Sequence, residues 1–124
     1  MGRGNRMAGR AGELAAIRFL KDNGYRILET NARTPFGEID MVAEKKGVTI
    51  FVEVKARITS SLGPPYLSIT KIKERHIVKN ALCYLKRRGL VESCWRIDIV
   101  SVKLNYEYRV ESIELFENAI EDNN

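Results

Sequence analysis

The chain is poor in the residues that build zinc sites, disulfides and nucleophilic triads: its 124 residues include one histidine and two cysteines. The single histidine, His76, excludes a His-rich zinc site and weakens any Ser-His-Asp or Cys-His assignment. The cysteines, Cys83 and Cys94, lack metal-ligand spacing and are too few for a disulfide framework. We therefore expect a reducing, cytoplasmic environment.

Long hydrophobic runs are also absent. The longest mainly apolar stretch, residues 14–20, is interrupted by Arg18 and is far shorter than the roughly 20 residues needed to cross a bilayer. No apolar signal region opens the chain, and no Walker or Gly-x-Gly-x-x-Gly motif is present. From the short apolar stretch we expect no membrane association. The length of the chain, with only three prolines and no internal repeat, predicts one domain over residues 1–117. An acidic, frayed tail is expected over residues 118–124.

The formal net charge is +5, but acids are concentrated near the end of the chain. Residues 104–124 hold six acids and a single base, Arg109, which leaves about +10 on the remainder. A basic body suits a polyanion, because lysine and arginine contacts to phosphates release condensed counterions. Nucleic acid is therefore the expected partner, and an ordinary solvated basic surface is the alternative.

Periodicity predicts seven elements in the order α-β-β-β-α-β-β. A first helix covers residues 5–23, and a second begins after Thr70 and ends before Gly89. Strands are predicted over residues 25–31, 37–44, 48–57, 95–104 and 109–116, with a loop over residues 58–69. Lys46-Gly47 suits a tight hairpin turn between the second and third strands. We expect an α/β fold in which a mixed central sheet is flanked by a helix on each side.

Four ionisable side chains stand in the strands of this predicted hairpin: Glu38, Asp40, Glu53 and Lys55. If the loop has two residues, Asp40 lies directly opposite Glu53, and Glu38 lies opposite Lys55. Cross-strand Cβ atoms are roughly 4.5–5.5 Å apart, so two carboxylates there repel unless a cation or proton lies between them. Such oxygen ligands suit Mg²⁺ or Mn²⁺, and the lysine could orient or deprotonate an attacking water. The alternative is a structural ladder of ion pairs.

Two further groups of polar residues lie outside the hairpin. The second helix carries a basic stripe formed by Lys71, Arg75 and Lys79, which suits either a phosphate track or a solvated helix face. Asp98 lies in the middle of a predicted strand, where we expect it to be a buried hydrogen-bond acceptor, for instance toward Arg96 or a neighbouring backbone amide.

Two segments, Gly37-Glu38-Ile39-Asp40 and Phe51-Val52-Glu53-Val54-Lys55-Ala56-Arg57, resemble the bacterial YraN-like family of uncharacterised proteins. That family looks like a branch of the PD-(D/E)XK nuclease superfamily, and the resemblance spans nearly the whole chain. It implies a restriction endonuclease-like fold, with Asp40 as the motif aspartate, Glu53 at the D/E position and Lys55 as the lysine. Ile39 stands where the superfamily pattern has proline. Glu13 is placed like the first-helix acid that archaeal Holliday-junction resolvases contribute to their metal site.

We therefore expect a nuclease that depends on Mg²⁺ or Mn²⁺ and hydrolyses phosphodiester bonds in DNA, with branched or flapped DNA as candidate substrates. Asp40, Glu53 and Glu13 would be metal ligands, and Lys55 would position or activate water; Glu38 would be an additional site residue. A homodimer would suit two-fold substrates such as four-way junctions. One alternative is a non-catalytic nucleic-acid-binding module that acts through partners in repair or recombination. Cleavage of RNA is a third possibility.

Overall fold

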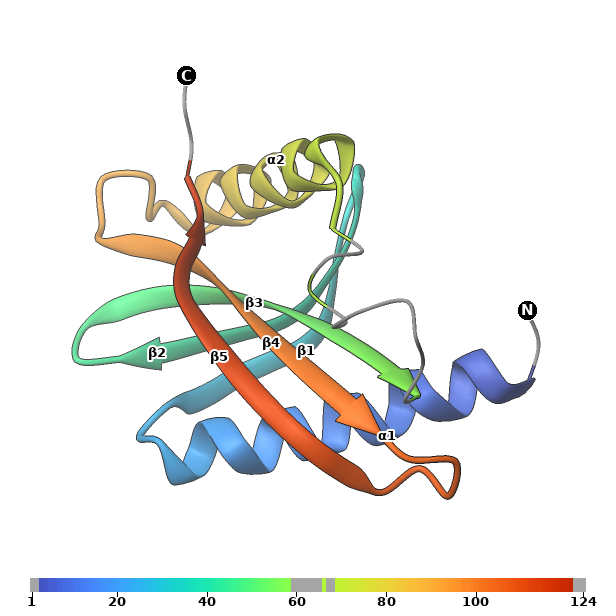
Figure 1. Ribbon diagram of the computed structural model, residues 1–124. Helices are drawn as coiled ribbons and strands as arrows, with labels where there is room; N and C mark the ends of the chain where they lie inside the picture. Colours follow the sequence, from blue (N-terminus) through green and yellow to red (C-terminus); the bar gives the residue numbers. More distant parts are fainter. Residues whose placement is uncertain (1–2, 59–65, 67–68, 122–124) are drawn as a thin grey trace.

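The computed structural model describes residues 3–58, Tyr66 and residues 69–121, with side chains from Arg6 onward. Within these ranges the elements, shown in Figure 1, are α1 (Arg3–Asp22), β1 (Arg26–Thr34), β2 (Gly37–Lys45), β3 (Val48–Ile58), α2 (Lys71–Arg88), β4 (Trp95–Leu104) and β5 (Val110–Ile120). Their order is the predicted one. Ile58, expected in a loop, is the last residue of β3, and most of that predicted loop, residues 59–65 and 67–68, lies outside the described part of the chain.

The five strands form one mixed sheet in the order β1-β2-β3-β4-β5. Neighbouring strands are antiparallel except β3 and β4, which run parallel and are connected through α2. A parallel pair needs a long crossover connection, and a helix is the usual way to make it. The restriction endonuclease-like arrangement predicted from the sequence, a mixed central sheet flanked by helices, is therefore confirmed.

Each face of the sheet is covered by one helix, and each helix closes its own hydrophobic core (Figure 1). Ala16 and Leu20 of α1 belong to one core together with Val102 of β4. Leu85 of α2 and Phe51 of β3 belong to the other. Full burial of a Leu or Phe side chain stabilises the fold by about 1.5–3 kcal/mol, so the central strands are held firmly from both sides. No helix within the described ranges is long and apolar enough to cross a membrane.

The β2–β3 hairpin has the predicted two-residue turn. Lys46 and Gly47 have φ angles of 51° and 79°, which are typical of a type I′ turn whose twist matches that of the strands. The strands pair in the register expected for this loop, as far as the pair of Met41 with Val52. This is the last backbone pair of the ladder, so Asp40, the neighbour of Met41 on the side away from the turn, is not part of it.

Two strands, β1 and β5, extend several residues beyond their predicted ends. β1 continues to Thr34 because Pro35 and Phe36 form the turn of a further hairpin, in which Thr34 pairs with Gly37. β5 continues to Ile120, whose side chain is only 5% exposed. Residues 118–120 therefore belong to the sheet and not to a frayed tail, whereas the assignment of a single domain stays a prediction.

Candidate metal centre

Asp40 lies where the β2–β3 ladder has ended. Its Oδ2 atom accepts a hydrogen bond from the backbone N–H of Val54 at 2.8 Å. The packing of β2 changes sides at the same point, because Met41 belongs to the core under α1 whereas Ile39 belongs to the core under α2. The divergence of β2 from β3 explains why a side-chain carboxylate, and not a backbone carbonyl, meets the Val54 N–H.

Glu53, on the adjacent strand, shares a hydrogen bond with Asp40. Burial, the negative charge of Asp40 and this hydrogen bond raise the pKa of Glu53 to about 8. Burial also raises the pKa of Asp40, although the Val54 N–H, Glu53 and Lys55 act in the opposite direction by stabilising its ionised form. At neutral pH Glu53 is therefore protonated, and its carboxyl O–H donates a hydrogen bond to the Asp40 carboxylate. The two carboxyl groups are in contact, although the ladder ends one pair before Asp40 and Glu53, which the sequence predicts to lie directly opposite each other.

Lys55 follows Glu53 by two residues on β3 and interacts electrostatically with both carboxyl groups. Burial lowers the pKa of Lys55, and the charge of Lys73 and a hydrogen bond with its side chain lower it further. Glu53 and Asp40 favour the charged form of Lys55 and so oppose this shift. The site therefore combines a carboxyl pair with two lysine side chains in mutual contact.

Lys73 of α2 is a site residue that the sequence interpretation missed. The helix begins at the predicted N-cap Thr70, whose hydroxyl accepts a hydrogen bond from the Lys73 backbone N–H at 3.2 Å. Lys73 precedes by one helical turn Ile77, which packs against the core under α2. Residues four apart lie on the same face of a helix, so Lys73 shares the face of Ile77 that is turned toward the sheet. This spacing was the signal in the sequence that could have identified Lys73 as a site residue.

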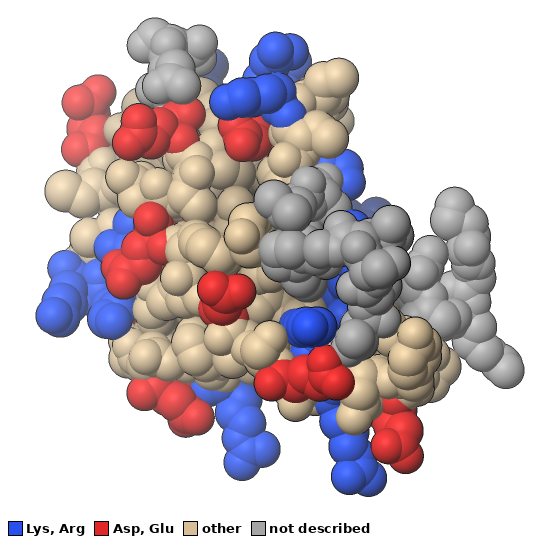
Figure 2. All heavy atoms as spheres, viewed as in Figure 1, with Lys and Arg blue, Asp and Glu red and all other residues tan. Residues whose placement is uncertain are grey.

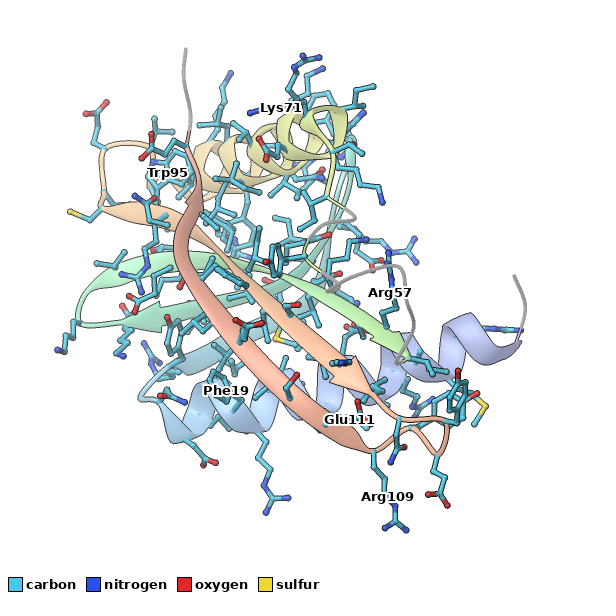
Figure 3. The ribbon with its side chains drawn as sticks, viewed as in Figure 1. Phe19, Arg57, Lys71, Trp95, Arg109 and Glu111 are labelled. Atoms are coloured by element: carbon cyan, nitrogen blue, oxygen red, sulfur yellow. The ribbon has the colours of Figure 1, made fainter. Side chains whose placement is uncertain are left out.

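The basic residues predicted to contact nucleic acid, Lys71, Arg75 and Lys79, are exposed on α2. Lys71, near the start of the helix in Figure 3, forms an exposed ion pair with Glu74 at 3.8 Å. The Lys79 ammonium lies 5.3 Å from the centre of the Phe36 ring in the β1–β2 turn. These contacts fit a phosphate track and a solvated surface equally well, and the role of the stripe stays a prediction.

Glu13 reaches the site because α1 crosses β3 at very short range. The end of β3 that carries Arg57 lies over α1 in Figure 3. A Cβ atom added at Gly12 would lie 2.3 Å from the Cβ of Ala56, so the approach requires glycine. Burial and the charge of Asp40 raise the pKa of Glu13. This acid therefore lies within electrostatic range of the carboxyl pair, on the helix where the resemblance places a metal-site acid.

Asn31 links Glu13 to Glu38. Its side-chain amide donates to Glu13 Oε1 at 3.3 Å and to Glu38 Oε1 at 3.1 Å. Its φ of 52° is a value that asparagine tolerates better than most residues, and an asparagine inside a strand pattern was the only hint in the sequence. Glu38 lies opposite Arg33 of β1, with the side chains 3.9 Å apart. Its expected position opposite Lys55 is wrong, because the β2–β3 ladder ends before it reaches Glu38.

The acids suit a hard cation that takes few protein ligands. Among the residues described, no three His, Cys, Asp or Glu side chains are grouped closely enough to hold a metal ion by themselves. Mg²⁺ commonly takes one or two carboxylates and keeps several waters, so a pair such as Asp40 and Glu53 is chemically sufficient. The proton between them occupies a place where a cation would equally relieve the repulsion of two carboxylates. Glu13 could add a further negative charge.

Asp98 is fully buried and accepts several hydrogen bonds. Its carboxylate accepts hydrogen bonds from the Tyr25 hydroxyl at 2.8 Å, from Arg96 Nε at 2.9 Å and from the Asn118 backbone N–H at 2.8 Å. Asn118 has a φ of 49° and lies where the β4–β5 register shifts. The prediction that Asp98 is a buried hydrogen-bond acceptor is confirmed.

The side of the molecule that carries the edge strand β5 does not present one continuous basic surface among its described residues. Figure 2 shows acidic and basic side chains interspersed on this face. The strand β5 carries exposed acids that include Glu114 and Glu117. The helices are richer in bases, since α1 carries five arginines and lysines and α2 carries eight arginines, lysines and histidine together. A polyanion would therefore be attracted more strongly to the helical sides of the molecule.

Comparison with known proteins places the chain in a family. A "UPF0102 protein" of Desulfosudis oleivorans is 51% identical over 115 residues, which are 93% of this chain and 90% of the relative. A "UPF0102 protein" of Pelobacter propionicus is 45% identical over 119 residues, 94% of this chain and 84% of the relative.

Among solved structures, Pyrococcus furiosus SfsA in complex with Ca²⁺ matches with a TM-score of 0.40 and 13% identity, over 95% of this chain and 65% of that chain. A likeness at this level supports no argument about function. The family profile described as "Uncharacterised protein family UPF0102" matches residues 12–102, a range that contains Glu13, Asp40, Glu53 and Lys55. The chain therefore belongs to the UPF0102 family, and its resemblance to the YraN-like proteins is confirmed.

Proposed function

We propose that this protein is a metal-dependent nuclease that hydrolyses phosphodiester bonds in DNA. One observation carries the proposal: the carboxyl groups of Asp40 and Glu53 are in contact at the end of the β2–β3 ladder, with Lys55 beside them. A buried carboxyl pair raises the free energy of the folded state, so it is more easily understood as a site for a cation than as a stabilising feature.

Asp40 and Glu53 would hold Mg²⁺ or Mn²⁺, and Glu13 would contribute charge from α1. When bound, such an ion would polarise the phosphoryl oxygen, lower the pKa of a bound water and neutralise developing charge. The Val54 N–H fixes one oxygen of Asp40, and Asn31 holds Glu13 and Glu38 in place. Hydrogen bonds that fix the positions of carboxylate oxygens in this way preorganise a site before its substrate binds.

Lys55 would orient the attacking water or accept its proton. Burial and the nearby Lys73 lower the pKa of Lys55, which moves the amine toward the range in which a general base works at neutral pH. Two lysine side chains in contact repel each other unless an anion lies between them. A scissile phosphate is an anion of this kind, and Lys73 would then stabilise the charge that develops on its oxygens.

The basic side chains of the helices would guide the nucleic acid to the site. Lys71, Arg75 and Lys79 are exposed on the same helix as Lys73, and contacts from such residues position a substrate without reading its sequence. Branched or flapped DNA is the substrate class to test first. A homodimer would suit four-way junctions, which have two-fold symmetry.

One observation favours the alternative of a non-catalytic nucleic-acid-binding module. Among the described residues no cluster of three acidic, histidine or cysteine side chains is assembled for a metal ion. A protein that had lost turnover would bind DNA in the presence of a chelator, and its binding would be unchanged by Asp40→Asn.

Titration calorimetry followed by cleavage assays on the same samples tests the proposal. Mn²⁺ is titrated into the wild-type protein, into the Asp40→Asn, Glu53→Gln double variant, and into Glu92→Gln as a control. Glu92 is an exposed acid that follows the C-terminal end of α2. The site residue Lys73 lies in the first turn of that helix, so Glu92 is at the opposite end of α2 from the site. The samples are then incubated with labelled linear, nicked, branched and single-stranded DNA and with RNA.

We expect the wild-type protein and the control to bind Mn²⁺ and cut DNA, and the double variant to lose both properties. Loss of a positioned acid or base reduces rates by about 10²–10⁴-fold, which is readily measured. Metal binding that is equal in all three proteins, together with no cleavage of any substrate, would contradict the proposal. Cleavage restricted to RNA would retain the chemistry and change the substrate.

A further inference from the structure

A groove of about 860 Å³ lies between α1 and β1, beside the candidate metal centre. Its volume is within the range of about 300–1,000 Å³ that is usual for ligand sites. Glu13 and Asn31 line the groove and also belong to the acid cluster, where the Asn31 amide donates to Glu13 at 3.3 Å. The groove therefore opens directly onto the site and continues it along α1.

Arginine side chains give the groove a positive charge. Arg6 and Arg10 line it from successive turns of α1, and both are exposed. Neither forms an ion pair with an acid in the part of the chain that the structure describes. A guanidinium is weakly hydrated and matches phosphate geometry, so two unpaired guanidiniums along a groove are suited to consecutive phosphates.

The remainder of the groove wall on α1 is apolar and has an open notch. Met7 and Leu14 line it and are 46% and 62% exposed, so both side chains are accessible to a ligand. Gly9 also lines it, and a Cβ atom added there would meet nothing within 4 Å. An apolar wall beside two cations matches a chain that alternates flat bases with charged phosphates.

We propose that this groove binds an unpaired strand of the nucleic-acid substrate next to the bond that is cut. Arg6 and Arg10 hold its phosphates, while bases lie against Met7 and Leu14. A duplex keeps its bases stacked inside, so only an unpaired strand can present them to an apolar wall. The inference rests on the proposed function and deepens it, because it names the substrate class as nucleic acid with a single-stranded segment at the site.

Binding measured without metal tests the groove separately from catalysis. Fluorescence anisotropy is recorded with a labelled 15-nucleotide thymidine strand and with a 15-base-pair duplex, in EDTA. The variants are Arg6→Ala with Arg10→Ala, and Arg18→Ala with Lys21→Ala as a matched control. The control pair removes the same charge from exposed positions of the same helix that do not line the groove.

We expect the Arg6, Arg10 pair to weaken single-strand binding by at least tenfold and the control pair by less than twofold. The salt dependence of binding should also fall by about 1.4 log units per log unit of salt, since each phosphate contact to a single strand contributes about 0.7. Equal losses in the two pairs, or a wild-type protein that prefers the duplex or binds neither probe, would overturn the inference.

A second pair of variants leaves the arginines in place. Gly9→Glu puts a long acidic side chain in the groove and should abolish single-strand binding. Asn23→Glu adds the same charge at an exposed position just beyond α1 that does not line the groove, and it should leave binding within twofold of wild type. Circular dichroism shows whether both variants keep their helices. Retained binding in a folded Gly9→Glu variant would contradict the inference. A protein that binds the strand in EDTA but never cuts it would disprove the proposed nuclease and leave the groove assignment intact.

Discussion

Gly12 of α1 lies so close to Ala56 of β3 that a Cβ atom at position 12 would be 2.3 Å from the alanine Cβ. This contact presses the helix against the strand that carries Glu53 and Lys55, and the next residue of the helix is Glu13. The short approach is therefore what brings an acid from α1 into range of the hairpin carboxyl groups. A packing contact in the core and the composition of the site depend on the same glycine.

The first prediction concerns that contact. Gly12→Ala should destabilise the protein by about 1–3 kcal/mol, the usual effect of overpacking a close-packed interior. Gly9→Ala is the matched control on the same helix, because its Cβ would meet no atom within 4 Å. It should stabilise the protein by up to about 1 kcal/mol through helix propensity. Urea denaturation of both variants measures the difference. Similar free energies of unfolding for the two variants would contradict the geometry described for Gly12.

The second prediction concerns pH and the Glu53 carboxyl group. Its pKa is raised from 4.5 to about 8 in the folded protein, so the folded state binds an extra proton between these values. Stability contributed by this group is therefore present below about pH 4.5 and is lost as pH rises through about 8. Glu53→Gln keeps the shape of the protonated side chain and an N–H donor for Asp40, but the amide does not ionise in this pH range.

The Tm of Glu53→Gln should therefore exceed that of the wild-type protein by an amount that grows from pH 5 to pH 9. Each kcal/mol corresponds to about 4 °C for a domain of this size, which calorimetry resolves. Glu92→Gln, at an exposed position, should differ from wild type by a constant amount over the same range. A constant difference for Glu53→Gln as well would show that Glu53 is not held in its protonated form.

The third prediction separates Lys73 from the rest of the basic surface. Lys73→Ala should lower the rate of DNA cleavage by about 10- to 100-fold, because a charge aimed at the developing oxyanion is lost. Mn²⁺ binding should be retained, since the carboxyl groups remain. Lys71→Ala on the same helix removes an exposed lysine whose described partner is Glu74, and should change the rate less than twofold at saturating DNA. Equal effects of the two substitutions would assign Lys73 to general attraction of DNA.

Local patterns predicted those parts of the molecule that depend on neighbouring residues. Lys46-Gly47 and the alternation around it were enough to predict the hairpin register as far as Met41 and Val52, and the closeness of the Asp40 and Glu53 carboxyl groups just beyond it. Thr70 and Gly89 were enough to predict the ends of α2. Such features follow from turn geometry and capping, which act over a few residues.

Features that depend on long-range packing could not be derived in this way. The spacing of the sequence does not bring Glu13 to the hairpin; the family resemblance indicated that position, and the structure shows a close helix crossing that accounts for it. Lys73 contacts Lys55 only because the crossover between β3 and β4 folds α2 back over the sheet. The end of β5 was missed because Ile120 stands in a segment rich in acids and asparagine, and its burial depends on its pairing with Ile97 of β4.

The final prediction tests whether Asp98 is structural. Asp98 is fully buried and ion-paired with Arg96, whose side chain also donates to the Tyr25 hydroxyl at 3.1 Å. Tyr25→Phe removes a donor from the Asp98 carboxylate and should cost about 1–3 kcal/mol of stability, because a buried charged group is left with a weaker set of partners. Asp98→Asn should destabilise the protein further, since it leaves Arg96 without its closest carboxylate.

If Asp98 serves the fold alone, the fraction of Tyr25→Phe that remains folded should bind Mn²⁺ and cut DNA like the wild-type protein at a temperature well below its Tm. A loss of Mn²⁺ binding in a variant that circular dichroism shows to be folded would place Asp98 in the metal centre instead.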